Sequence, residues 1–304
     1  MPDLEPYIRR IPALRDLPPA ALEAERLGGM TNLVYRLRGA GADYVLRVAG
    51  AGTEAYIDRK VEAHNSQAAA AAGVSPEVLF FDPADGLMLM PHVESTTMTP
   101  ELFRSTAGAP ARAGRAFRQL HDSGRRFEFR FELFAMIDGY LKVLEPLGAE
   151  LPEGYHQAVG EAGTVRRLLE ARPGELAPCH CDPLCENFLD TGERMWIVDW
   201  EYSGMNDPLW DLGDLSVEAG FDAEEEAELL EAWCGGPVAP AVQGRVVVYK
   251  AMCDLLWTLW GLIQHANGNA AEDFWAYSTG RFERCRALMA DPVFARSLRA
   301  VEEG

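Results

Sequence analysis

The sequence predicts an α+β fold, in which a small and mostly antiparallel β-sheet with one helix is followed by a larger and mostly helical part. Three observations support this prediction. Short β-rich runs separated by turn residues fill the first ninety positions. Longer stretches with helical character begin near residue 99. One strand-rich island, over residues 178–200, interrupts these later stretches.

The first part of the chain, residues 1–92, is expected to form an N-terminal lobe. Residues 33–39 and 43–50 are β-rich runs joined by Gly-Ala-Gly-Ala, which is the pattern of a hairpin. An Ala-rich stretch over residues 54–73 predicts a helix, which Gly73 and the following Pro76 would end. Residues 78–91 predict two further strands around an Asp-Pro and Asp-Gly turn.

The second part, residues 93–304, is expected to form a helical C-terminal lobe. The boundary is drawn after Pro91, where polar residues at 95–97 separate the two patterns. Helices are expected at seven places in this lobe: 99–123, 131–148, 155–171, 209–219, 222–234, 240–266 and 271–300.

Charge and composition exclude several classes of protein. The 304 residues include 28 basic and 47 acidic side chains, a formal net charge of −19 at pH 7. This acid excess argues against nucleic acid and against an anionic membrane surface as partners, because both need a basic face. No apolar signal segment is predicted at the N-terminus, and the most apolar stretch, 251–264, contains Asp254. Six scattered cysteines fit a reduced, cytoplasmic protein.

The strongest motif is His180-x-Asp182 followed five residues later by Asn187. This is the spacing of a phosphoryl-transfer catalytic loop, in which the Asp accepts the proton of the attacking hydroxyl and the Asn offers its amide oxygen to Mg²⁺. Asp199 follows an apolar strand and is well placed as the second metal ligand. We therefore predict Asp182 as the catalytic base. The alternative is a polar turn whose side chains cap backbone groups.

A phosphoryl-transfer site also needs a part that binds ATP. Residues 28–32, Gly-Gly-Met-Thr-Asn, precede a strand and could cover phosphates, with Thr31 and Asn32 as the polar residues of this loop. Arg47 is expected to supply the cation for the phosphates, because the hairpin contains no lysine. Glu62 is its expected ion-pair partner, and Lys60 is a second candidate for phosphate. The alternative is an ordinary surface pair.

The segment that leaves the predicted sheet is a candidate for contact with adenine. Residues 87–93 are expected to cross between the two lobes, so that adenine would meet the backbone near Pro91 and His92. An ordinary buried strand is the alternative interpretation of this stretch.

The acceptor pocket is expected on the late helices. Trp257 and Trp260 are three residues apart on one apolar helix, and Tyr277 opens the last helical stretch. Stacked aromatic rings near an acid suit a quaternary ammonium, and Glu218 could supply that acid. The alternative is that the two tryptophans belong to the hydrophobic core.

Taken together, these motifs resemble the choline/ethanolamine kinase family, within the wider aminoglycoside-phosphotransferase-like group. The resemblance covers most of the chain, and its matching segments are 28–32, 44–48, 180–187, 197–204, 211–218, 255–264 and 277–282. It implies a two-lobed, protein-kinase-like fold. It also implies ATP- and Mg²⁺-dependent phosphorylation of a small cationic alcohol, with choline as the first expectation.

The resemblance also implies roles for individual residues. These are Asp182 as base, Asn187 and Asp199 as metal ligands, Arg47 with Glu62 for the phosphates, and Trp257, Trp260 and Tyr277 as an aromatic box with Glu218 facing the ammonium. The segment after Glu218 lacks the Tyr-rich run of eukaryotic choline kinases, and Phe221 is the candidate for a fourth wall.

Several alternatives stay open. Ethanolamine, thiamine or an aminoglycoside could be the acceptor in place of choline. A catalytically silent, kinase-like binding module is an alternative of another class, although all three catalytic polar residues are present. Zinc on Cys179, His180, Cys181 and Cys185 is disfavoured, because their spacing departs from paired C-x₂-C ligands. His121 is expected to be a packing residue at a helix end.

Overall fold

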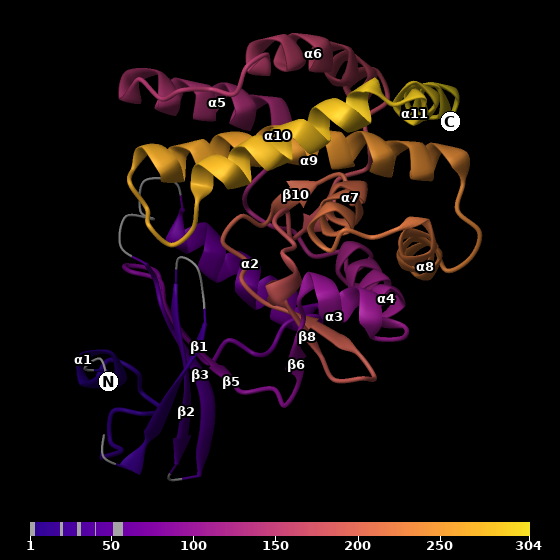
Figure 1. The fold of residues 1–304 in the computed structure, drawn as a ribbon. Helices are drawn as coiled ribbons and strands as arrows, with labels where there is room; N and C mark the ends of the chain where they lie inside the picture. The colour runs from indigo at the N-terminus through magenta and orange to yellow at the C-terminus, as the bar shows by residue number, and fades with distance from the viewer. Residues whose placement is uncertain (1–3, 19–20, 29–31, 40, 51–56) are drawn as a thin grey trace.

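The sheet and most of the helices occupy separate regions of the molecule (Figure 1). The structure is a computed structural model that describes residues 4–18, 21–28, 32–39, 41–50 and 57–304. Helix α2 (Arg59–Ala71) lies between the sheet and the later helices, the N-terminus lies beside the sheet, and the C-terminus lies at the far end of the helical region. The predicted α+β arrangement is confirmed.

The N-terminal sheet has five antiparallel strands in the order β1-β2-β3-β5-β4. Their bounds are β1 (Glu23–Gly28), β2 (Leu33–Gly39), β3 (Ala42–Val48), β4 (Phe80–Asp82) and β5 (Leu87–Pro91). The hairpin predicted over 33–50 is present as β2 and β3. Strand β1 was not predicted, because it lies at the edge of the sheet with nearly all of its residues exposed and has no alternating apolar pattern.

A small hydrophobic core covers one face of this sheet. Leu37 and Leu46 from the hairpin are fully buried, and they belong to one cluster with Ile8, Ile11 and Leu14 from the N-terminal segment. That segment begins with the short helix α1 (Glu5–Ile8). It therefore acts as a cover for the sheet, a role that its sequence alone did not indicate.

Helix α2 presents polar side chains to the helical region. Asp58 caps its first turn by accepting hydrogen bonds from the N–H groups of Lys60 and Val61, so the helix begins five residues later than predicted. The Asn65 amide donates to the carbonyl oxygen of Ser203 at 2.9 Å. This contact ties α2 to the strand-rich island and fixes which face of the helix turns toward the later residues.

The helical region contains most of the elements that were predicted. Their bounds are α3 (Pro100–Ser105), α4 (Ala109–His121), α5 (Leu133–Leu144) with the short η3 (Glu145–Leu147), α6 (Tyr155–Ala171), α7 (Leu209–Glu218), α8 (Ala223–Cys234), α9 (Pro240–Ala266), α10 (Phe274–Ala290) and α11 (Pro292–Glu303). Two predicted helices were too long. The first is broken at Gly108, where φ is +73°, and the second at Asp291, whose carboxylate caps α11.

Helix α9 is the central helix of this region, with α10 and α11 lying along it (Figure 1). Its length and apolar composition would suffice to cross a membrane, but 89% of its most apolar window is buried inside the protein, as in a core helix. A Cβ atom on Gly261 would lie 2.3 Å from the Ser278 hydroxyl and 2.6 Å from the Tyr277 ring. The missing side chain therefore lets α10 approach α9 closely.

The strand-rich island forms two small antiparallel sheets. Strand β7 (Ala177–Cys179) pairs with β10 (Gly204–Asn206), while β8 (Phe188–Asp190) pairs with both β6 (Thr96–Thr97) and β9 (Met195–Ile197). Two loops connect these strands, over residues 180–187 and 198–203. They bring the predicted catalytic residues to one side of the helical region.

Candidate active site

The loop after β7 is held by the buried side chain of Asp211 from α7. One carboxylate oxygen of Asp211 accepts the N–H of His180 and the other accepts the N–H of Cys181, each at 2.8 Å. Cys181 has φ of +69°, a conformation that L-residues adopt only where the surroundings hold them. The His180 ring lies 2.9 Å from the carbonyl oxygen of Val198, which ties this loop to the next one.

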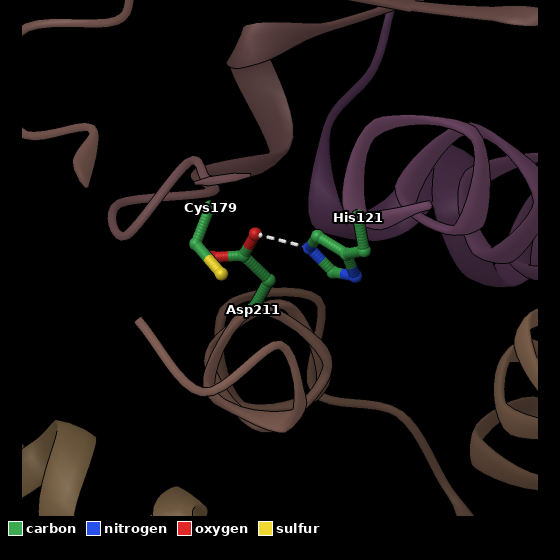
Figure 2. Close-up of side chains that lie close together, drawn as sticks. All are labelled: His121, Cys179 and Asp211. Carbon is green, nitrogen blue, oxygen red and sulfur yellow. Dashed lines mark hydrogen bonds and ion pairs between the residues drawn. The ribbon is translucent and has the colours of Figure 1, made fainter. Parts of the chain in front are cut away.

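Asp211 has a second buried partner, the imidazole of His121 (Figure 2). The indole N–H of Trp233 donates to Nδ1 of His121 at 2.9 Å, so the ring proton lies on Nε2 and is donated to Asp211. His121 ends α4, as predicted, but it also supports the catalytic loop through Asp211. Asp211 itself was not singled out, because one acid near the start of an amphipathic helix is unremarkable in sequence.

Cys179, Cys181 and Cys185 are buried in this region. Figure 2 shows Cys179 beside Asp211 and His121, and one possible ligand atom from each of these residues lies within 4.8 Å of the others. Burial raises the pKa of the Cys179 and Cys181 thiols well above the ordinary value. Within the part of the chain that the structure describes, the ligand atoms of Cys179, His180, Cys181 and Cys185 do not gather around one point.

The predicted base, Asp182, follows this anchored segment directly. Burial is the main cause that raises its pKa to about 7, the charge of Glu218 adds to the effect, and Arg281 opposes it. The side-chain amide of Asn187 donates its N–H to the carbonyl oxygen of Asp182 at 3.1 Å. The loop therefore brings Asp182 and Asn187 together, and this hydrogen bond leaves the amide oxygen of Asn187 available for another partner.

Asp199 lies just beyond β9, in a backbone conformation with φ of +67°. Burial and the neighbouring carboxylate of Glu201 raise its pKa well above the ordinary range, and the Arg47 guanidinium opposes this effect. The Nη1 atom of Arg47 lies 3.4 Å from Oδ1 of Asp199. This contact links β3 of the N-terminal sheet directly to the loop after β9.

Arg47 and Glu62 form a buried ion pair, with 4% and 0% of their side chains exposed. They are therefore no surface pair. Arg59 bridges Glu62 and Glu201 through contacts of 2.6 Å to each. Together with Asp199 these residues make an acid–arginine cluster, consisting of Arg47, Arg59, Glu62, Asp199 and Glu201. Arg59 and Glu201 were missed, because their partnership depends on segments 142 residues apart.

The loop before β2 reaches the same cluster. The Asn32 side chain is buried and donates to Glu201 at 3.0 Å, and its amide oxygen accepts the N–H of Gly50 at 3.2 Å. The other residue predicted there, Thr31, lies outside the described residues. Lys60, the second candidate for phosphate, is exposed at the start of α2.

The acid–arginine cluster has the chemistry of a site for a divalent cation and an anion. Carboxylate oxygens of Glu62, Asp199 and Glu201 lie within 4.8 Å of one another. Such hard oxygen donors suit Mg²⁺. The Nε atom of Arg47 is buried without a hydrogen-bond partner among the described residues, and it could donate to an anionic group. The residues present therefore fit a metal–phosphate complex.

Pro91 and His92 lie where the chain leaves the sheet. Pro91 pairs with Tyr44 at the end of β5, and the His92 backbone N–H donates to the carbonyl oxygen of Asp43 at 3.0 Å. Proline has no N–H, and the His92 N–H is already used. A base bound at this crossing would thus need other backbone groups of the 87–93 segment.

The three predicted aromatic residues meet at the junction of α9 and α10, together with a fourth. The Trp260 indole donates to the Tyr202 hydroxyl at 3.0 Å, and the Tyr202 ring lies edge to face against Trp257, with ring centres 5.4 Å apart. Trp260 and Tyr277 are also edge to face, at 5.9 Å. We call Tyr202, Trp257, Trp260 and Tyr277 the aromatic cluster.

Phe221, predicted as the fourth wall, lies elsewhere. It is 8% exposed, and its only ring contact within the described parts of the chain is with Phe103, in the core of the helical region. Tyr202 takes the expected place beside the tryptophans. Its position, three residues after Asp199, could have suggested this role, because the loop after β9 returns toward α9.

Glu218 lies at the end of α7, where Arg281 of α10 forms an ion pair with it. The Arg281 guanidinium also lies 3.1 Å from Asp254 and stacks over the Tyr277 ring, 4.7 Å from its centre. Arg284 pairs with Asp254 as well, at 2.6 Å. A pocket of about 240 Å³ opens here, with Glu218, Tyr277 and Arg281 in its wall.

Acids outnumber bases at this end of the site. Four acidic residues lie here, which we call the acceptor-end acids: Asp182, Asp214, Glu218 and Asp254. Arg281 and Arg284 are the two cations that act on them within the described residues. Formal negative charge is therefore in excess beside the aromatic cluster, and a cationic ligand would balance it.

Most residues of this site lie in the part of the chain that matches one protein family. Residues 23–245 match the phosphotransferase enzyme family. Protein LicA of Haemophilus influenzae is 28% identical over 276 residues, which are 87% of this chain and 79% of LicA. Ethanolamine kinase 2 of Mus musculus is 25% identical over 274 residues, which are 79% of this chain and 68% of the mouse protein.

Solved structures share the fold over nearly the whole chain. A choline/ethanolamine kinase family protein from Mesorhizobium loti is 59% identical with a TM-score of 0.90, covering 99% of this chain and 98% of that one. Choline kinase LicA from Streptococcus pneumoniae is 28% identical with a TM-score of 0.75, covering 88% and 93%. A LicA structure in complex with AMP is 28% identical with a TM-score of 0.73, covering 88% and 91%.

Proposed function

The chain belongs to the phosphotransferase enzyme family as a small-molecule kinase of the choline/ethanolamine kinase type, and from that premise we propose its substrates. It transfers the γ-phosphoryl group of ATP, with Mg²⁺, to the hydroxyl of a small cationic alcohol. Choline is the proposed acceptor and phosphocholine the product.

The observation that carries this proposal is the pairing of surplus acid with aromatic rings. Two arginines face four acceptor-end acids, and the aromatic cluster lies against them. A quaternary ammonium cannot donate hydrogen bonds, so it is held by aromatic faces and by nearby negative charge. Choline matches both features in one small molecule.

In the proposed reaction, Asp182 orients the choline hydroxyl and accepts its proton. The alcohol oxygen forms a bond to the γ-phosphorus, the bond to the bridging oxygen of ADP breaks, and the proton passes to the Asp182 carboxylate. The raised pKa of Asp182 suits a group that must take up a proton near neutral pH.

The phosphate end of the reaction is assigned to the acid–arginine cluster. Arg47 holds the phosphates, and Glu62 fixes the orientation of its guanidinium. Asn187 and Asp199 are the proposed ligands of Mg²⁺. The chemistry that Mg²⁺ supplies when bound is neutralisation of charge on the phosphate oxygens. In this arrangement residues 1–92 form the nucleotide lobe and residues 93–304 the lobe that binds the alcohol.

Ethanolamine is the second candidate acceptor. Its primary ammonium donates hydrogen bonds, and the Glu218 carboxylate in the pocket wall could accept one of them. The choice between the two alcohols therefore depends on whether aromatic faces or carboxylate oxygens dominate the binding of the cation.

ADP release tests the proposal directly. The purified protein is assayed with choline, ethanolamine, thiamine and kanamycin, each with and without Mg²⁺, beside an Asp182→Asn variant. We expect Mg²⁺-dependent ADP release with choline above the other three, and a loss of about 10³-fold or more in Asp182→Asn with nucleotide binding kept. Preference for another alcohol would reassign the acceptor, and absence of turnover with all four would favour the silent binding module.

A further inference from the structure

Asp214, a buried acid of α7, contacts the aromatic cluster through Trp257. The Asp214 side chain is 1% exposed. One of its oxygens accepts the indole N–H of Trp257 at 3.3 Å, and the other accepts the Cys253 thiol at 2.8 Å. Both donors belong to α9, and neither carries a charge. The carboxylate thus lies at the N–H edge of one ring of the aromatic cluster.

Asp214 has no cationic partner, unlike the acceptor-end acids Glu218 and Asp254. No Arg, Lys or His within the described residues forms an ion pair with it. Arg281, the cation that lowers the pKa of Asp214, is bound to Glu218 and Asp254. Unpaired buried charge is costly, so its retention calls for a compensating role.

Nearby acidic residues raise the free-energy cost of ionising Asp214. Glu218 and Asp182 both act on it electrostatically and, together with burial, they raise its pKa well above the ordinary range. A positive ligand bound against the aromatic cluster would oppose this effect and favour the ionised form of Asp214. A neutral ligand of the same size would not oppose it.

We propose that Asp214 determines the specificity of this kinase for a cationic over a neutral alcohol, acting through Trp257. Its hydrogen bond to the indole fixes the orientation of the ring and adds negative charge at the N–H edge, which strengthens the attraction of the ring for an ammonium. The inference rests on the proposed function, since it takes the aromatic cluster as the acceptor pocket. In this inference, a residue that does not touch the substrate distinguishes cationic from neutral alcohols.

The test uses two alcohols of the same shape. Choline and its uncharged carbon isostere, 3,3-dimethylbutan-1-ol, are compared as acceptors for the wild type and for Asp214→Asn. Asparagine keeps the size of the side chain and an oxygen that can accept the Trp257 N–H, but it removes the charge. We expect the KM for choline to rise about tenfold, with kcat and the KM for ATP within about twofold and the KM for the isostere unchanged.

A matched variant separates charge from packing. Cys253→Ala removes the other hydrogen bond to Asp214 and leaves the carboxylate in place, so the preference for choline over the isostere should persist. If Asp214→Asn does not fold, Trp257→Phe serves instead, because it removes the donor to Asp214 and retains an aromatic ring. It should weaken choline more than the isostere.

Failure of this inference can be told apart from failure of the proposed function. If the wild type phosphorylates choline and Asp214→Asn weakens both alcohols equally, or neither, Asp214 is not a specificity residue. If the wild type itself prefers the neutral isostere to choline, the proposed acceptor is wrong. A loss of preference in Asp214→Asn alone, with Cys253→Ala normal, supports the inference.

Discussion

His121 and Asp211 join two helices beneath the catalytic loop: Nε2 of His121 lies 2.9 Å from the Asp211 carboxylate, and both side chains are buried. Because Asp211 also holds the N–H groups of His180 and Cys181, the pair supports the backbone just before Asp182. The Asp211 carboxylate therefore connects His121 to the loop that carries Asp182.

His121→Ala should therefore slow catalysis without a matching loss of substrate affinity. We expect kcat to fall about 10- to 100-fold while both KM values stay within about threefold, because the loop carrying Asp182 loses its support. His121→Gln should recover much of the activity, since its amide can donate to Asp211 and accept from Trp233. Equal kcat in the wild type and His121→Ala would contradict this role.

Asp182→Asn should stabilise the ligand-free protein at alkaline pH. Asp182 has a pKa of about 7 when folded, against an ordinary value of 3.8, so the folded state resists its ionisation. The cost is absent below pH 3.8, grows as pH rises and is complete above pH 7. At pH 8 the variant should gain about 4 kcal/mol over the wild type, since each pKa unit between the two values is worth about 1.4 kcal/mol.

Denaturant unfolding at pH 5 and pH 8 measures this effect. The difference between Asp182→Asn and the wild type should be larger at pH 8. Asp16→Asn is the control, because the Asp16 side chain is 90% exposed and its replacement should change stability by less than about 0.5 kcal/mol at either pH. A variant that is less stable than the wild type at pH 8 would rule out the proposed cost of ionisation.

Trp260→Ala should distinguish a quaternary from a primary ammonium. Removing this ring takes one aromatic wall from the cluster, so the KM for choline should rise about tenfold and that for ethanolamine about two- to threefold. Trp196→Ala is the control, because Trp196 lies on β9 beneath Arg194 and outside the aromatic cluster. Equal losses for both alcohols in Trp260→Ala would argue against an aromatic box.

The sequence predicted those parts of the site whose residues are close together along the chain. The loop from His180 to Asn187 is recognisable by its spacing, and Trp257 and Trp260 share one helical face. The Arg47–Glu62 pair could be predicted because one hairpin and the next helix contain it. Helix lengths failed where a single residue interrupts a long periodic stretch, as at Gly108 and Asp291.

The missed residues depend on contacts between distant segments. Glu201 contacts the predicted Asn32, which lies 169 residues away in the sequence, and Asp214 of one helix contacts Trp257 of another. In sequence, Asp211 and Asp214 are ordinary acids of a mixed helix, and only packing reveals that both are buried. Tyr202 was included in a matched segment, but its place against Trp260 depends on the path of the loop after β9.

Gly261 affects the shape of the acceptor pocket, although it does not line that pocket. Its missing side chain sets how near α10 comes to α9, and hence the separation of the Tyr277 and Trp260 rings. A methyl group there would push α10 away from α9 and so move Tyr277, which lines the pocket. A substitution at a position that does not line the pocket can thus alter the range of alcohols accepted, in evolution or engineering, with every pocket-lining side chain left as it is.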